Sequence, residues 1–127
     1  MKPDWTDARR RGDVETLERL LDRGADINAL DPHGQTSLML AARDGQVAVV
    51  GVLVDRGAAL DHSAKYRLTA LMLAVIAGHA EIVRLLVDAG ANTTLRGSGA
   101  PGFHGRTALD LAVAAGRHDL AEWLRQM

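Results

Sequence analysis

The first candidate for a chemical function is a glycine-rich stretch near the C-terminal end of the chain, which could bind a phosphate group. Residues 97–102 read Gly-Ser-Gly-Ala-Pro-Gly, which has the spacing G-x-G-x-x-G. Such a loop can present backbone N–H groups to a pyrophosphate when it joins a strand to the N-terminus of a helix. No strand pattern precedes this loop, and Pro101 lacks an N–H group. We therefore interpret residues 97–102 as part of a surface insertion and expect no cofactor.

Five histidines are the next candidates, because imidazole is a common metal ligand. They are His33, His62, His79, His104 and His118. The sequence is repetitive, and His33 and His104 occupy the same position in two of its repeat units. One other unit lies between these two. If neighbouring units are spaced by about 10 Å, these side chains lie about 20 Å apart, whereas a bond to a metal is about 2 Å long. We predict no metal site, and we assign His79 to capping and packing at the start of a helix.

No catalytic constellation can be assembled from the other side chains. The chain has no cysteine, which excludes disulfides, thiolate zinc sites and cysteine nucleophiles. It also offers no convincing Ser-His-Asp arrangement, paired-carboxylate cleft or H-E-x-x-H motif. We therefore predict that the protein is not an enzyme.

Length and charge narrow the choice of partners. The 127 residues suit one domain with a sizeable core, and the formal net charge is -1. A balanced charge gives no basic field for a phosphate backbone, so we expect no nucleic acid partner. No apolar run approaches the ~20 residues that cross a bilayer, and the N-terminus shows no secretory signal, so we expect no membrane association and a cytoplasmic monomer. Arginine outnumbers lysine thirteen to two, a bias that hints at a bacterial source.

A repeat of thirty-three residues organises the chain and must position these side chains. Thr36, Leu38, Ala41 and Gly45 recur as Thr69, Leu71, Ala74 and Gly78, and Gly24, Gly57 and Gly90 have the same spacing. Self-similarity at one fixed period indicates stacked structural units. From Thr69 to Thr107 the spacing grows to thirty-eight, so five residues are inserted within residues 96–106.

The repeated residues resemble the ankyrin repeat, whose usual form is D-x-x-G-x-T-P-L-H-x-A-A-x-x-G-x-x-x-x-V-x-x-L-L-x-x-G-A-D-x-N. The resemblance covers almost the whole chain and implies an all-α fold, an ankyrin-like α-solenoid of stacked helix pairs with turn tips. We place the units of a single domain, residues 1–127, at 1–30, 31–63, 64–96 and 97–127. The first and last units are polar enough to serve as caps.

Turn and capping residues predict where the helices lie. The expected helices cover residues 3–11, 14–23, 37–43, 47–56, 107–115 and 119–126. Residues 69–91 should form two helical segments that are hinged at Gly78 and His79 and end at Gly90. Asp13 and Thr36 are suited to cap the helices that follow them. The third unit's tip, residues 64–68, carries Arg67 in place of the usual glycine, so a turn needing a positive φ there would be strained or differently built.

The resemblance also bears on how neighbouring units are held together. In the family, the histidine of T-P-L-H ties neighbouring repeats by hydrogen bonds, but this chain has Met39 and Met72 at that position. We therefore expect thioether packing there.

The resemblance implies binding of another protein through the turn tips and the exposed side of each first helix. The positions carried over are Pro32, His33, Gln35, Arg43, Asp44, Lys65, Tyr66, Leu68, Ile76, Ala77, Phe103, His104 and Arg106. Tyr66, Leu68, Ile76 and Phe103 would form an apolar centre, with Arg43, Asp44, Arg96 and Arg106 as charged flanks. An aromatic and aliphatic centre with a charged rim is typical of a protein interface.

We therefore predict a non-catalytic protein–protein interaction module, with the partner contacting mainly the unusual tip and the insertion. Two alternatives are a regulatory or immunity-type inhibitor of a specific enzyme or toxin, and a small-molecule-binding protein that uses residues 97–106. The apolar centre also has a purely structural interpretation. In that case Tyr66 and Phe103 fold back over the tip and the insertion, while Leu68 and Ile76 pack between units.

Overall fold

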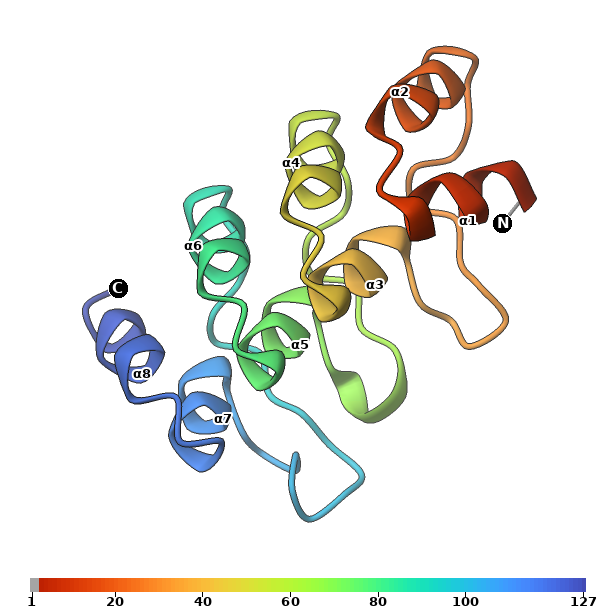
Figure 1. Cartoon of the computed structure of the whole chain (residues 1–127). Helices are drawn as coiled ribbons and strands as arrows, with labels where there is room; N and C mark the ends of the chain where they lie inside the picture. Colours follow the sequence, from red (N-terminus) through yellow and green to blue (C-terminus); the bar gives the residue numbers. More distant parts are fainter. Residues whose placement is uncertain (1–2) are drawn as a thin grey trace.

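The computed structural model describes residues 3–127, which fold as helix hairpins stacked side by side (Figure 1). The elements are α1 (Pro3–Arg11), α2 (Val14–Asp22), α3 (Ser37–Asp44), α4 (Val47–Asp55), the 3-10 helix η1 (Lys65–Arg67), α5 (Ala70–Ala77), α6 (Ala80–Asp88), α7 (Ala108–Ala114) and α8 (His118–Arg125). Helices α1, α3, α5 and α7 form an inner layer, and α2, α4, α6 and α8 form an outer layer. Residues 3–127 contain no β-strand, only isolated β-bridges. The predicted all-α solenoid is confirmed.

Threonine side chains fix where three of the inner helices begin. Thr36, Thr69 and Thr107 each accept a hydrogen bond from the backbone N–H three residues later, at 3.2 to 3.3 Å. Such a cap satisfies an N–H group that has no partner within the helix and contributes about 1 kcal/mol. Asp110 returns the bond in α7 by accepting from the Thr107 N–H, which completes a capping box. The prediction that Thr36 caps its helix is confirmed.

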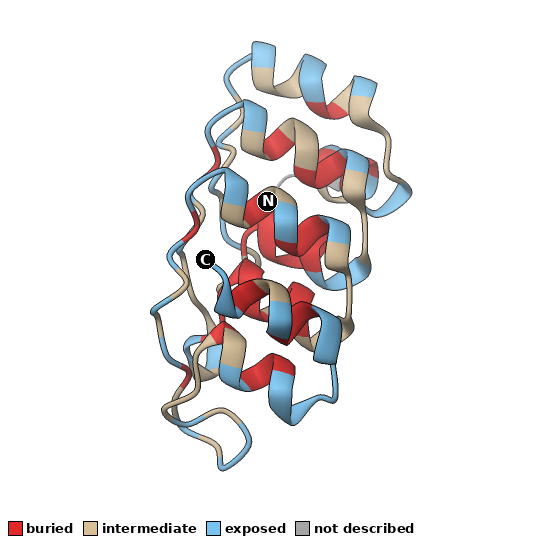
Figure 2. Ribbon diagram, turned by 90° about the vertical axis from the view of Figure 1, so that its left-hand side faces the viewer, coloured by how far each residue is buried: buried red, intermediate tan, exposed pale blue. Residues whose placement is uncertain are grey.

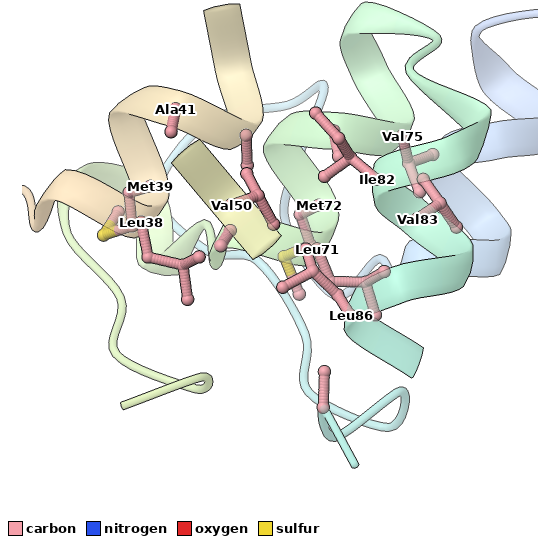
Figure 3. Packing of buried hydrophobic residues seen from close by; sticks show 14 of the residues in the cluster. Leu38, Met39, Ala41, Val50, Leu71, Met72, Val75, Ile82, Val83 and Leu86 are labelled. Carbon is pink, nitrogen blue, oxygen red and sulfur yellow. The ribbon is translucent and has the colours of Figure 1, made fainter. Parts of the chain in front are cut away.

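The core lies between the two layers and between neighbouring hairpins (Figure 2). Side chains with at most 2% exposure include Leu38, Met39, Leu71, Met72, Ile82, Val83 and Leu86. Figure 3 shows these side chains gathered between α3, α5 and α6. Helices of eight or nine residues are marginal alone, so burial of about 1.5–3 kcal/mol per large side chain must hold them in place. The predicted packing of both methionines is confirmed.

A ladder of hydrogen bonds also ties each hairpin to the one before it. The residue just before an outer helix donates to a carbonyl near the C-terminal end of the inner helix that belongs to the previous hairpin. The bonds are Gln46 Nε2 to Arg9 O at 2.8 Å, His79 Nε2 to Arg43 O at 3.0 Å and Arg117 Nη2 to Ile76 O at 3.2 Å. These carbonyls have no partner within their own helices. The ladder therefore provides ties between units in a chain that lacks the T-P-L-H histidine.

Two glycines make room for this ladder. Gly45 and Gly78 have φ of 77° and 81°, which favours glycine. A Cβ atom on Gly45 would lie 2.8 Å from the His79 ring, and one on Gly78 would lie 2.7 Å from the Arg117 guanidinium. The repeat glycine is therefore needed both to end the inner helix and to admit the side chain of the next hairpin.

Candidate protein-binding surface

The predicted contact residues lie on one side of the stack. Three long loops project past the inner helices on the side away from the outer layer (Figure 1). They are the second-unit tip (residues 31–36), the third-unit tip (residues 64–68) and the insertion loop (residues 96–106). We call the side formed by these loops and the C-terminal turns of the inner helices the concave side.

A groove opens at the N-terminal end of this side, and we call it the N-terminal groove. Its volume is about 590 Å³, and it is lined by Thr6, Arg9, Arg10, Asp31, Pro32, His33, Gln35, Leu40, Arg43 and Asp44. These residues come from α1, α3 and the second-unit tip. The structure therefore brings five of the predicted contact residues into one groove, namely Pro32, His33, Gln35, Arg43 and Asp44.

The second-unit tip is held rigid by its own aspartate. The Asp31 Oδ1 atom accepts hydrogen bonds from the backbone N–H groups of His33 at 2.9 Å and Gln35 at 2.8 Å. This Asx-type turn satisfies the carboxylate locally and leaves Pro32 and His33 exposed. The turn therefore presents two contact candidates, Pro32 and His33, to solvent.

Arginines on α1 and α3 set the electrostatics of the groove. The Arg9 guanidinium is almost fully buried, and its Nη1 lies 2.9 Å from Asp44 Oδ2 and 3.0 Å from Gln46 Oε1. Asp44 Oδ1 also accepts from Arg43 Nε at 2.9 Å. The hydrogen bond from Arg43, followed by that from Arg9, lowers the pKa of Asp44 below its ordinary value of 3.8, although partial burial opposes the shift. Asp44 is thus a paired anion that holds Arg43 in the groove wall.

Sequence reasoning missed part of this groove. Thr6, Arg9, Arg10 and Leu40 are not among the predicted contacts, and the first unit, which holds three of them, is predicted to be a polar cap. A signal was present, since Arg10 and Arg43 are spaced by thirty-three residues. Equal repeat positions on adjacent inner helices lie side by side.

At the other end of the concave side, the third-unit tip and the insertion loop pack on each other. Ser98 N donates to Tyr66 O at 2.8 Å, and the Tyr66 and Phe103 rings have centroids 5.3 Å apart at an angle of 38°. The insertion loop is closed at its base, where Gly97 N donates to Arg106 O at 2.9 Å. Both aromatic side chains are half-buried. The two loops therefore form one unit, which we call the tip–insertion cluster.

The third-unit tip is built differently from the second-unit tip. Tyr66 and Arg67 have φ of 61° and 56°, so two residues that are not glycine adopt the left-handed conformation within η1. Such residues cost about 1–2 kcal/mol each unless their surroundings hold them. The bond from Ser98 and the ring contact with Phe103 supply that support. The expectation of a differently built turn is confirmed, because Tyr66 as well as Arg67 has a positive φ.

One predicted contact residue is wrong. Leu68 was placed in the exposed apolar centre, but it is 8% exposed and belongs to the core cluster. It is the last residue of the third-unit tip, and its apolar side chain turns inward because burial removes it from water. Ile76 and Ala77 are half-buried at the end of α5, whereas Lys65 and His104 are exposed and Arg106 is half-buried.

Two other features of the described chain bear on the site. Among residues 3–127, no group of three or more His, Cys, Asp or Glu side chains is arranged to hold a metal ion. Within the same range, no helix has the length and apolarity needed to cross a membrane.

Comparison with known proteins identifies the family. The family model described as ankyrin repeats (3 copies) matches residues 6–97 and, in a second match, residues 68–127. No curated protein matches the chain. The two matches together cover nearly all the hairpins described above. The chain belongs to the ankyrin repeat family.

Proposed function

We propose that this chain is a non-catalytic module that binds another protein on its concave side. Ankyrin repeats are generally protein–protein interaction modules. The observation that carries the proposal here is the N-terminal groove, whose walls are the two elements expected to meet a partner: a turn tip and the ends of two inner helices. In this proposal the module acts as a cytoplasmic monomer, without nucleic acid or a membrane.

The rest of the concave side complements the groove. Beyond Arg43, the end of α5 presents Ile76 and Ala77, which are half-buried, and the end of α7 presents Ala114 and Ala115, which are exposed. Apolar contact area beside polar, hydrogen-bonding groups is the usual anatomy of a non-obligate interface. The polar groove and the apolar helix ends together support the proposal.

The experiment compares two double-alanine variants that alter opposite sides of the molecule. The concave variant combines His33→Ala with Gln35→Ala, because the described bonds of these residues to Asp31 use only backbone atoms. The convex control combines Glu15→Ala on α2 with Glu81→Ala on α6, both exposed. Each protein is immobilised and used to capture proteins from a lysate of the source organism, with thermal unfolding measured alongside.

We expect the wild type and the convex control to capture the same protein, and the concave variant to lose it while unfolding at nearly the same temperature. Capture that is unchanged in the concave variant but lost in the convex control would contradict the proposal, because the partner would then bind the outer helices.

A further inference from the structure

One position of the repeat lies in the last turns of the inner helices and changes character along the stack. It is occupied by Arg10, Arg43, Ile76 and Ala114 in α1, α3, α5 and α7, at spacings of thirty-three, thirty-three and thirty-eight residues. Successive inner helices contact one another in this order. The row therefore runs from two guanidinium groups to two apolar side chains across the concave side.

The guanidinium groups of Arg10 and Arg43 carry N–H groups that could still donate hydrogen bonds to a partner. Arg10 is exposed, and its side chain makes no hydrogen bond or ion pair within the described chain. Arg43 donates to Asp44 through Nε, so its terminal Nη groups are not used by that bond. Arg9 differs from both, because its guanidinium is buried and bonded to Asp44 and Gln46.

The carboxylates of the groove do not compete for this capacity. Asp31 accepts from two backbone N–H groups of its own tip, and Asp44 is shared between Arg9 and Arg43. Three arginines and only two carboxylates line the groove, so it retains positive charge although the whole chain has a formal net charge of -1. A carboxylate is the group that matches a free guanidinium in charge and in paired hydrogen-bond geometry.

We propose that the N-terminal groove receives an acidic segment of the partner protein, with an Asp or Glu side chain between Arg10 and Arg43 and an apolar side chain against Ile76. This inference rests on the proposed function and specifies the chemistry of its partner. Neighbouring inner helices lie about 8–10 Å apart, so Ile76 lies about one and a half spacings, or about 12–15 Å, from the midpoint between Arg10 and Arg43. An extended chain covers that distance in about four residues. The expected partner motif is therefore an acidic residue followed or preceded, about four positions away, by a large apolar residue.

The same row favours a polypeptide over a nucleic acid. A phosphate backbone needs a continuing series of cations, because each neutralised phosphate adds to the affinity. Here the cations at this position stop at Arg43, and Ile76 and Ala114 follow. A change from charged to apolar side chains along one row matches a peptide whose side chains change in the same way.

A displayed library of random peptides tests the proposal. Peptides about 12 residues long suffice, because they extend over about 40 Å and can cross the concave side. Peptides selected on the wild type are synthesised, and their dissociation constants are measured by fluorescence polarisation. The variants are Arg10→Gln, Arg43→Gln and the double substitution, and Arg23→Gln is the matched control. Arg23 is exposed at the end of α2, outside the residues that line the groove.

We expect the selected peptides to share an Asp or Glu near an apolar residue. Each single Gln variant should weaken binding about tenfold or more, as loss of a charge-assisted hydrogen bond does. Arg23→Gln should bind as the wild type does, and added salt should weaken binding of the wild type more than that of the double variant. Replacing the shared acidic residue by its amide should weaken the peptide on the wild type but not on the double variant.

The possible failures separate this inference from the proposed function. Selected peptides that lack an acidic residue, or that bind the double variant with full affinity but lose binding to the His33→Ala, Gln35→Ala variant, would overturn the acidic motif and leave protein binding on the concave side intact. Peptides that bind every concave variant equally, or a library from which nothing is selected, would overturn both. A short single-stranded DNA that binds with the same dependence on Arg10 and Arg43 would overturn the inference in favour of nucleic acid.

Discussion

The N-terminal groove and the tip–insertion cluster both contain turn tips of the repeat, but the side chains of these tips have different roles. In the groove, the second-unit tip satisfies its own polar groups through Asp31, and Pro32 and His33 stay exposed. In the cluster, Tyr66 and Phe103 pack on each other, and Leu68 is buried. In the two irregular loops the apolar side chains pack on each other or in the core. In the regular second-unit tip the side chains of Pro32 and His33 remain exposed and can contact a partner. An irregular loop sequence in this repeat protein therefore indicates that neighbouring loops pack on each other, and it does not by itself indicate a binding site.

The test with the largest expected change in the free energy of unfolding replaces one residue in each tip by alanine. Leu68→Ala should lower the free energy of unfolding by about 2–4 kcal/mol, because it removes a buried leucine and leaves a cavity. Pro32→Ala, at an exposed position of the second-unit tip, should change it by less than about 1 kcal/mol. Urea unfolding measures both. Equal losses in the two variants would show that the tips do not differ in structural role.

The second test measures how strongly the two loops of the cluster are coupled. Tyr66→Ala, Phe103→Ala and the double variant form a double-mutant cycle, and we expect a coupling energy of about 0.5–1.5 kcal/mol from the ring contact. The same cycle on His33 and Arg43 in the groove should give a value near zero, because no contact between these side chains is described. Strictly additive losses for Tyr66 and Phe103 would mean that the rings do not stabilise the cluster.

Much of the fold follows from the sequence because its signals are local. The period of thirty-three, the capping threonines and the helix-ending glycines fixed most helix boundaries to within one or two residues. For Leu68 the sequence leaves two interpretations open, an exposed centre or packing between units, because its place in a tip does not reveal the direction of its side chain, and the structure has it buried. The Arg9–Asp44 pair was missed because its partners are thirty-five residues apart and neither position carries a local signal.

The hydrogen-bond ladder shows a second limit of reasoning by residue identity. Gln46, His79 and Arg117 are three different residue types at one repeat position. They share only a side chain that can donate a hydrogen bond, and each reaches a carbonyl of the preceding hairpin. Comparing the chemistry of equivalent positions, rather than their match to the ankyrin pattern, would have identified this tie.

A smaller effect tests the strain in the third-unit tip. Arg67→Gly should raise the free energy of unfolding by about 0.5 kcal/mol, because glycine relieves the positive φ but adds freedom to the unfolded chain. Lys65→Gly is the matched control, since Lys65 lies in the same short helix but is not among the residues with positive φ. It should be neutral or destabilising. If Arg67→Gly destabilises the protein as much as Lys65→Gly does, the tip stores no strain.

The smallest expected effect is the pH dependence contributed by Asp44 in the N-terminal groove. Its pKa in the folded protein lies below 3.8, chiefly because Arg43 and then Arg9 donate hydrogen bonds to the carboxylate. A depressed pKa stabilises the fold above the unfolded value and loses that contribution as the pH falls through the folded value. Since the Asp44 side chain is 37% exposed, solvent screening limits the contribution to a few tenths of a kcal/mol.

Urea unfolding of the wild type and Asp44→Asn over a series of pH values measures this contribution. We expect the wild type to be the more stable protein near neutral pH, and the difference to disappear as the pH falls below the folded pKa, where Asp44 is protonated and neutral like asparagine. A difference that does not change between neutral and acidic pH would mean that the ion pair with Arg9 and Arg43 contributes no charge-dependent stability. Asp44 would then position Arg43 without adding net stability, as many exposed ion pairs do.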